Sequence, residues 1–250
     1  MTSTKAPQVI LLHGVGLDHT MWQPLREQLG RESLALDLPG HGTQPALREE
    51  QDLASLAGDV LVRIPGEEPV HLVGFSLGAL IAQHIARFAP DRVLTLTAVS
   101  SVCRRAPAEA EAVESRLTTA GADFSEGVDK AIERWYPTAK TAVPASLIED
   151  TRRVLAGNDL ESYLHAYTVF ARGDRQIARE LSAITQPVLA ITGELDPGST
   201  PEMSRRLAAA VPDGTVHIVP GARHMLPVED PAALAAELNN FFEKNEGKHP

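Results

Sequence analysis

The sequence predicts an α/β fold, in which a mostly parallel sheet of about six strands carries helices on both faces and a helical cap is inserted between two strands. Two observations lead to this fold class. Short apolar runs alternate with longer segments whose apolar residues recur at helical spacing, and most of the runs end at a glycine-rich or polar turn. The strand pattern then disappears over roughly eighty residues and resumes near the C-terminus.

The predicted strands are short runs rich in Val, Ile and Leu, which is typical of buried parallel strands. They cover residues 8–12, 33–38, 70–73, 93–99, 188–192 and 215–219. Between them, apolar residues at helical spacing predict helices over residues 22–29, 53–64, 77–88, 203–211 and 231–242. Strands that alternate with helices in this order imply parallel crossovers.

Residues 103–183 differ from the rest of the chain because they are charged, rich in alanine and helical in their spacing. We expect them to form a helical cap, while residues 1–102 and 184–250 form the α/β core. Aromatic residues fall within this segment at Phe124, Trp135, Tyr136, Tyr163, Tyr167 and Phe170.

Composition and charge narrow the classes of partner. A net charge of −10 without a basic cluster argues against nucleic acid, and no apolar run reaches the length of a membrane span. We expect a cytoplasmic protein, monomeric or homodimeric, that binds a small molecule. The single cysteine, Cys103, excludes an internal disulfide, and we expect it to be a buried apolar residue. No metal or cofactor motif is present.

The segment Gly74-Phe75-Ser76-Leu77-Gly78 lies between a predicted strand and a predicted helix. This pattern is typical of a strained turn that exposes a nucleophilic serine, and the glycines leave room for the adjoining strand and helix. A tight turn with an incidental serine is the alternative. The flanking elements favour Ser76 as a nucleophile.

A serine hydroxyl needs a base to accept its proton and an acid to orient that base. Asp196 and His224 each follow a predicted strand, so their loops open on the same edge of the sheet as Ser76. His13 is a rival base, and Asp37 and Glu194 are rival acids. The order Ser, Asp, His favours Asp196 and His224.

A tetrahedral intermediate needs two hydrogen-bond donors aimed at its oxyanion. Leu77 follows the predicted nucleophile, so its backbone N–H is one expected donor. The turn after the first strand, at His13-Gly14-Val15, is expected to supply the second donor from the N–H of Val15.

Taken together, His13-Gly14, Gly74-x-Ser76-x-Gly78, Gly193-x-x-Asp196 and Gly221-x-x-His224 resemble the α/β-hydrolase superfamily over nearly the whole chain. Within it, residues 12–18, 133–136 and 196–201 are similar to the 3-oxoadipate enol-lactonase branch and its carboxylesterase-like relatives. Two departures stand out: the first antiparallel strands of the family are expected to be absent, and Ala79 replaces a common glycine. Neither departure removes a predicted catalytic group.

This resemblance implies small carboxylate or ester substrates of aromatic-compound catabolism. Cap residues that could receive such a substrate are Arg134, Trp135, Tyr163, Tyr167 and Arg172. Arginine can bind a carboxylate through two hydrogen bonds, although a solvated position on a helix is the alternative for each arginine.

The leading hypothesis is hydrolysis of an ester or enol-lactone through an acyl-enzyme on Ser76. The same groups could cleave an amide or a C–C bond in a ring-fission product, because fold and triad do not fix the scissile bond. A non-catalytic ligand-binding protein is the alternative of another class. A cofactor-free oxidative enzyme, for which Trp22 near the oxyanion loop would matter, is a further alternative.

Overall fold

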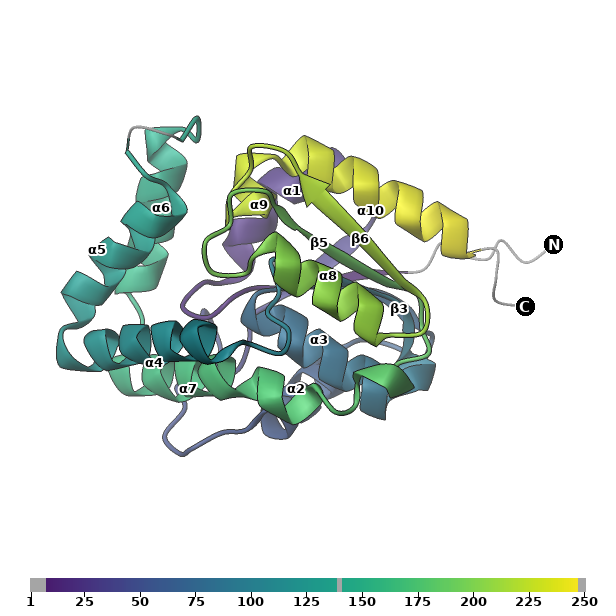
Figure 1. The fold of residues 1–250 in the computed structure, drawn as a ribbon, viewed down its shortest axis with the longest axis horizontal. Coiled ribbons are helices and arrows are strands. Elements are labelled where there is room, and N and C mark those ends of the chain that lie inside the picture. Colours follow the sequence, from purple (N-terminus) through teal and green to yellow (C-terminus); the bar gives the residue numbers. More distant parts are fainter. Residues whose placement is uncertain (1–7, 139–140, 247–250) are drawn as a thin grey trace.

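The computed structural model describes residues 8–138 and 141–246. Six strands form one sheet in the order β2-β1-β3-β4-β5-β6, and every adjacent pair is parallel (Figure 1). The strands are β1 (Val9–Leu12), β2 (Ser33–Leu36), β3 (Val70–Phe75), β4 (Val93–Val99), β5 (Val188–Gly193) and β6 (Gly214–Val219). Each coincides with one of the predicted runs to within two residues, which confirms the fold class.

Burial within the sheet follows the sequence pattern. Every residue of β1, β3, β4 and β5 is buried, whereas the edge strand β6 is exposed over its first half. Strands covered on both faces need continuous apolar sequence, and an edge strand does not. The four central strands therefore lie in the middle of the hydrophobic core, between the two helix layers.

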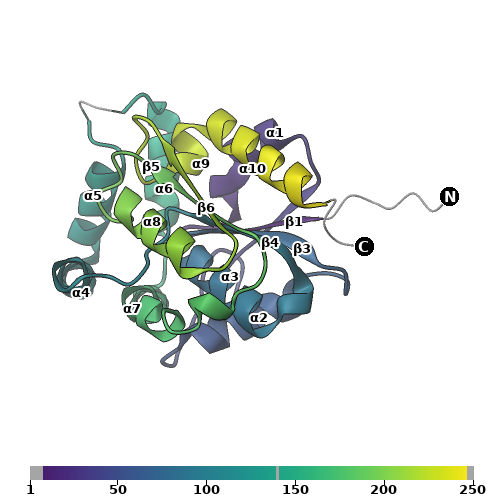
Figure 2. The same cartoon turned by 45° about the vertical axis from the view of Figure 1, so that its right-hand side comes forward.

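Helices cover both faces of the sheet. Figure 2 shows α1 (Gln23–Leu29) and α10 (Pro231–Glu246) on one face and α2 (Leu53–Arg63) and α3 (Leu77–Phe88) on the other. Helix α8 (Pro201–Ala210) packs beside β5 and β6. Shorter helical turns complete the core: η1 (His19–Trp22), η2 (Pro90–Arg92), η3 (Leu181–Ala183) and α9 (Leu226–Glu229).

Local sequence sets the helix starts. Asp52 accepts the N–H of Ser55, whose side chain accepts the N–H of Asp52 in return, so a reciprocal capping box begins α2. Thr200 caps α8 and Pro201 is its first residue, which places the start two residues before the predicted helix. Apolar spacing missed this first turn because its residues are polar or proline.

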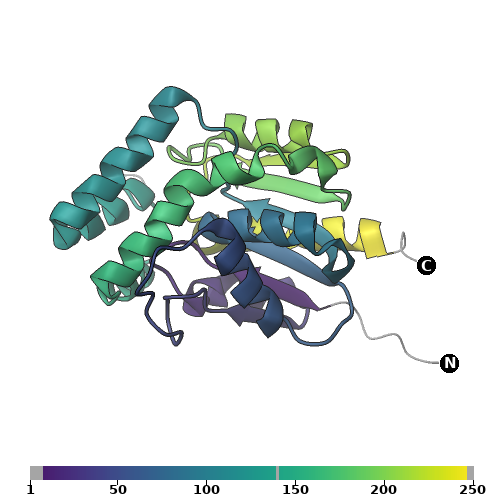
Figure 3. The same cartoon turned by 90° about the horizontal axis from the view of Figure 1, so that it is seen from below.

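The segment between β4 and β5 folds into four longer helices, α4 (Pro107–Ala122), α5 (Phe124–Trp135), α6 (Ala145–Ala156) and α7 (Leu160–Ile177). Figure 3 shows them beyond one end of the strands, and α7 also packs on α2 and α3. At the junction with the core, the buried Arg105 guanidinium lies 2.7 Å from the Asp174 carboxylate. The division into core and cap domains at residues 103 and 183 stays a prediction.

Among the described helices, none combines the length and the apolar character needed to cross a membrane. The described helices of the cap instead have polar outer faces, as the burial pattern of α4 and α6 shows.

One close contact joins the sheet, α3 and the loop after β1. The N–H of Gly78 donates to the carbonyl oxygen of His13 at 3.1 Å, and a Cβ atom at Gly78 would lie only 2.3 Å from the carbonyl oxygen of Leu12. Glycine is therefore required here for steric reasons. The contact brings the loop after β1 against the first turn of α3.

We expect Gly78→Ala to lower the free energy of unfolding by about 1–3 kcal/mol or more, because the methyl group would push α3 away from the backbone of β1. Gly58→Ala is the matched control: Gly58 is exposed in the middle of α2 with open space around its Cα. That change should raise the free energy of unfolding by up to about 1 kcal/mol. Urea denaturation of both variants tests this, and equal stabilities would contradict the steric account.

Candidate active site

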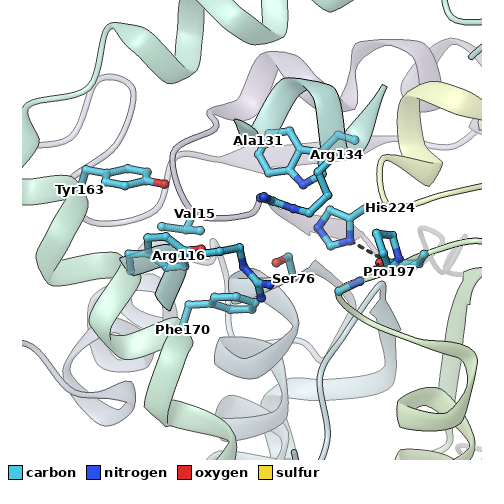
Figure 4. A pocket seen from close by; sticks show the side chains of 13 residues that line it. Val15, Ser76, Arg116, Ala131, Arg134, Tyr163, Phe170, Pro197 and His224 are labelled. Carbon is cyan, nitrogen blue, oxygen red and sulfur yellow. Dashed lines mark hydrogen bonds and ion pairs between the residues drawn. The ribbon is translucent and has the colours of Figure 1, made fainter. Parts of the chain in front are cut away.

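Ser76 lies at the sharp turn between β3 and α3, with φ 53° and ψ −111°. A non-glycine residue in such a conformation costs on the order of 1–3 kcal/mol, so the surrounding structure must impose it. The N–H of Ser76 donates to the carbonyl oxygen of Val99 on the neighbouring strand at 3.0 Å. Figure 4 shows the side chain facing the cavity that His224 also faces.

Asp196 and His224 pair as expected for a Ser–His–Asp triad. His224 follows β6 and Asp196 follows β5, and His224 Nδ1 lies 2.7 Å from Asp196 Oδ2. Because an ionised carboxylate only accepts hydrogen bonds, Nδ1 carries the proton. The second ring nitrogen, Nε2, is then free to accept a proton from a hydroxyl group.

The Asp196 carboxylate is held by its own loop. Its Oδ1 accepts the N–H groups of Gly198 at 2.9 Å and Ser199 at 2.8 Å, and Thr192 Oγ1 lies 3.3 Å from Oδ2. The side chain is fully buried. These contacts fix the carboxylate in the orientation that the imidazole requires.

Aromatic rings restrain the imidazole of His224 from two elements. The ring of Phe75 lies 5.0 Å away, centroid to centroid, and the indole of Trp135 stacks on it at 5.9 Å with a 22° angle between planes. Phe75 belongs to β3 and Trp135 ends α5. The cap thus contributes directly to the position of the candidate base.

Hydrogen bonds also hold the backbone on both sides of His224. The Ser100 hydroxyl donates to its carbonyl oxygen at 2.9 Å. Glu229 accepts the N–H groups of Arg223 and Met225 at 2.9 and 2.8 Å. Burial raises the pKa of Glu229 above its ordinary value, against the effect of these two N–H donors.

Two backbone N–H groups are available to bind an oxyanion. Leu77 begins α3, where the first N–H groups have no acceptor within the helix. Among the backbone hydrogen bonds of the described residues, none uses the N–H of Val15, and Val15 lines the same pocket as Ser76. Binding of an oxyanion by the N–H groups of Val15 and Leu77 stays a prediction.

Two buried histidines hold the loop that carries Val15. His41 Nε2 accepts the N–H of Gly16 at 2.9 Å, and His13 Nε2 accepts the N–H of Leu38 at 2.8 Å. Burial lowers the pKa of His13 to about 3 and also lowers the pKa of His41. Both of these rings therefore stay neutral, and His13 has both nitrogens engaged, which disfavours it as the base.

The rival acids also have structural partners. Asp37 is largely buried, and hydrogen bonds from Thr43 and His19 outweigh the effect of burial and hold its pKa well below the ordinary value. Glu194 accepts the N–H of Gly221 at 2.9 Å. Neither carboxylate lines the pocket that contains Ser76.

The pocket over Ser76, called the serine pocket below, has a cavity volume of about 40 Å³ and lies between the core loops and the cap. Of the predicted substrate-binding residues, four line it: Arg134, Trp135, Tyr163 and Tyr167. Arg172 does not line it, because its exposed guanidinium lies on α7 and pairs with Glu114 at 3.1 Å.

Sequence reasoning missed Arg116, which extends from α4 into the serine pocket opposite Arg134 (Figure 4). In the described part of the chain, neither of these two arginines forms an ion pair with a carboxylate, whereas nearby Arg105, Arg172 and Arg206 all do. Burial lowers the pKa of Arg134, but an arginine remains charged. The pocket therefore presents two guanidinium groups without a protein counter-ion.

The chain matches the model of the alpha/beta hydrolase family over residues 9–237. It belongs to this family. It is 29% identical over 239 residues to (E)-2-((N-methylformamido)methylene)succinate hydrolase of Acinetobacter baylyi, with 94% of this chain and 90% of the relative covered. It is 26% identical over 245 residues to 3-oxoadipate enol-lactonase 1 of the same organism, covering 94% of this chain and 88% of that one.

A solved structure agrees with the fold. The enol-lactonase from Burkholderia xenovorans superimposes with a TM-score of 0.84 at 24% identity, covering 97% of this chain and 94% of its own. At this identity the likeness concerns the fold. The family match and the shared architecture confirm the resemblance to α/β-hydrolases that the sequence motifs indicate.

Trp22 and Cys103, which could serve oxidative or nucleophilic chemistry, do not line the serine pocket. Trp22 is completely buried and packs edge-on against Phe75, with ring centroids 6.4 Å apart. Cys103 is buried, and burial raises the pKa of its thiol to about 11, so it is a poor nucleophile. Within residues 8–138 and 141–246, no three His, Cys, Asp or Glu side chains gather as metal ligands.

Acid should destabilise this hydrolase through His13. The native imidazole, with a pKa of about 3, stays neutral where an unfolded histidine takes up a proton near pH 6.5, so stability falls as the pH drops from about 6.5 towards 3. We expect His13→Gln, whose amide can donate and accept, to reduce this loss by up to about 1.4 kcal/mol per pH unit. Urea denaturation between pH 7 and 4.5 measures both slopes, and equal slopes would contradict the assignment.

Proposed function

We propose that this hydrolase cleaves a small carboxylic ester or enol-lactone through an acyl-enzyme on Ser76. The observation that carries the proposal is the 2.7 Å contact between His224 and Asp196 beside a serine held in a strained turn. This arrangement supplies a nucleophile, a base and an acid that fixes the tautomer of the base.

In the first half of the proposed reaction, Ser76 Oγ attacks the substrate carbonyl carbon while His224 Nε2 takes the hydroxyl proton. The tetrahedral oxyanion lies between the N–H groups of Val15 and Leu77. Collapse breaks the bond from the acyl carbon to the leaving oxygen, which receives the proton from His224. In an enol-lactone this oxygen stays attached to the same molecule.

Water completes the cycle. It gives a proton to His224 as it attacks the acyl carbon, and the acyl-oxygen bond to Ser76 then breaks with return of that proton to Oγ. Asp196 stays ionised and stabilises the imidazolium in both halves. The free acid leaves the pocket.

Arg134, Trp135, Tyr163 and Tyr167 belong to the proposed binding surface, together with Arg116. Two guanidinium groups without a protein counter-ion favour an acidic substrate, since burying an uncompensated charge is costly. Arg172 is not part of this proposal because it is exposed and paired.

An amide substrate is the second candidate, and one comparison favours it. The Acinetobacter relative at 29% identity is named for a substrate with an N-methylformamido group. The same triad could expel a nitrogen leaving group protonated by His224. Comparing matched esters and amides of one acid would separate these two reactions.

Labelling with a fluorophosphonate should place an adduct on Ser76, located by peptide mass. Ser76→Ala should lose this adduct and about 10⁴-fold or more of the p-nitrophenyl acetate turnover, because the variant lacks the hydroxyl that is proposed to form the acyl-enzyme. Ser204→Ala is the matched control, since Ser204 is a buried serine of α8 outside the pocket. Absence of an adduct with equal rates in all three proteins would favour a ligand-binding protein on the same fold.

Glu229 should act as a positioning residue for His224. We expect Glu229→Ala to lower kcat by up to about 100-fold with little change in KM, because it frees the backbone on both sides of the base. Glu229→Gln can still accept one of the two N–H groups and should recover part of kcat. Thermal denaturation monitors folding. A rise in KM with unchanged kcat would contradict the positioning role.

A further inference from the structure

The loop that carries Val15 begins with a tight turn of four residues, called the oxyanion turn below. The N–H of Leu17 donates to the carbonyl oxygen of Gly14 at 3.2 Å, and Gly16 has a φ of 76°. A glycine with positive φ at the third position is typical of a type II turn. The peptide group that ends in the Val15 N–H begins with the Gly14 carbonyl, so the groups that hold this carbonyl also orient the expected donor.

The cap contacts the oxyanion turn at Gly16. Asn158, between α6 and α7, has its Nδ2 atom 2.8 Å from the carbonyl oxygen of Gly16. A Cβ atom at Gly16 would lie 2.4 Å from Leu155 Cδ1 and 2.7 Å from Tyr163 Cε2, so two further cap side chains cover the glycine. The N–H of Gly16 donates to His41 of the core. The turn is therefore held between the core and the cap.

The surroundings of Asn158 define the orientation of its amide. Nδ2 lies near three carbonyl oxygens, those of Gly16 at 2.8 Å, Leu155 at 2.9 Å and Val154 at 3.0 Å. Because carbonyl oxygens only accept hydrogen bonds, the NH₂ group and not the amide oxygen faces them. The last carbonyl groups of a helix need such donors. Asn158 thus ties the end of α6 to the oxyanion turn.

Hydrogen bonds run in one direction from Asn158 to Val15. Asn158 donates to the carbonyl of Gly16, and the N–H at the other end of that peptide group belongs to Leu17. Leu17 in turn donates to the carbonyl of Gly14, and the peptide group of that carbonyl ends in the Val15 N–H. Consecutive hydrogen bonds of this kind polarise one another and strengthen each bond by roughly 10–30%. The chain both orients the Val15 N–H and makes it a better donor.

The core supports the last link of this chain. His13 Nε2 accepts the N–H of Leu38, so its Nδ1 carries the proton and donates to the Gly14 carbonyl oxygen at 2.7 Å. The Gly14 carbonyl therefore receives one hydrogen bond from the core and one through the chain that begins at Asn158. The first link of the chain comes from the cap.

We propose that Asn158 is a positioning residue of the reaction, which orients and polarises from the cap the peptide groups that present the Val15 N–H to the oxyanion. This inference rests on the proposed function, in which the oxyanion lies between Val15 and Leu77. The chain gains most when negative charge develops at its end, so it stabilises the transition state more than the bound substrate. The cap then serves the chemical step as well as the binding surface.

Asn158→Ala should lower kcat for p-nitrophenyl acetate by about tenfold with little change in KM, which is less than the roughly 100- to 1,000-fold loss on removing an oxyanion donor itself. Asn158→Ser retains one donor and should recover part of kcat. Asn239→Ala is the matched control, because Asn239 of α10 also donates to a backbone carbonyl, that of Leu29 at 3.0 Å, and lies outside the serine pocket. It should keep kcat. Thermal denaturation monitors folding, and equal kcat values in Asn158→Ala and Asn239→Ala would overturn the inference.

A pair of ketones gives a readout that loss of a helix cap alone would not change. Ser76 Oγ adds to the carbonyl carbon of benzyl trifluoromethyl ketone, His224 takes the hydroxyl proton, and the ketone oxygen becomes an oxyanion. Its inhibition constant should rise by about tenfold in Asn158→Ala, in step with the loss of kcat. Benzyl methyl ketone, which forms little adduct, should be affected little. Equal weakening of both ketones would contradict a role at the oxyanion.

Proton NMR of the backbone amides separates this inference from the proposed function. In a Ser76→Ala background, Asn158→Ala should move the amide proton of Leu17 upfield because its hydrogen bond to Gly14 weakens, and Asn239→Ala should leave it in place. If the signal does not move, or if it moves while kcat of Asn158→Ala is unchanged, the inference fails and the proposed function stands. If it moves while no turnover depends on Ser76, the proposed function fails together with the catalytic role of the chain, and only the chain itself remains.

Discussion

The close approach of α3 to the loop after β1 is the constraint on which the candidate site depends. Gly78 allows the first turn of α3 to lie against the backbone of Leu12 and His13, and its N–H donates to the His13 carbonyl oxygen at 3.1 Å. This contact brings the first turn of α3, which follows Ser76, against the loop that leads to Val15. The two expected oxyanion donors, Leu77 and Val15, lie within two residues of its two ends.

Each layer of the molecule supplies different groups. The parallel sheet brings Ser76, Asp196 and His224 together because the loops after β3, β5 and β6 meet at the carboxyl edge. The described cap helices supply the surfaces that would contact the rest of a substrate. Trp135 links the layers, since it lines the serine pocket and stacks on His224 at 5.9 Å.

The sequence predicted the residues of the candidate triad more completely than the residues that support them. Ser76, Asp196 and His224 lie in short motifs at strand ends, where local pattern and chain order define their place. Glu229 and Ser100 could not be found in this way, because each acts on the backbone around His224 from another element. Only their hydrogen bonds to the backbone around His224 identify them, and these hydrogen bonds exist only in the folded chain.

The cap shows the same limit more strongly. Arg134 and Arg172 are both helix arginines, and the packing of α4, α5 and α7 gives them different surroundings. Arg172 finds Glu114, whereas Arg116, which no motif marks, extends into the serine pocket. Helical spacing gives the face of one helix, but the partner of that face depends on how neighbouring helices cross.

Arg116 and Arg134, which have no protein counter-ion, could serve the proposed reaction in two ways. The chain carries a net charge of −10, yet the charged side chains that line the serine pocket from the cap are Arg116 and Arg134. Arg134 already experiences the charge of Asp196, which favours the charged guanidinium. A substrate carboxylate would neutralise one of these cations. The other would remain a cation in the same pocket while the oxyanion develops, so binding of an acid and electrostatic stabilisation of the transition state would draw on the same pair of residues.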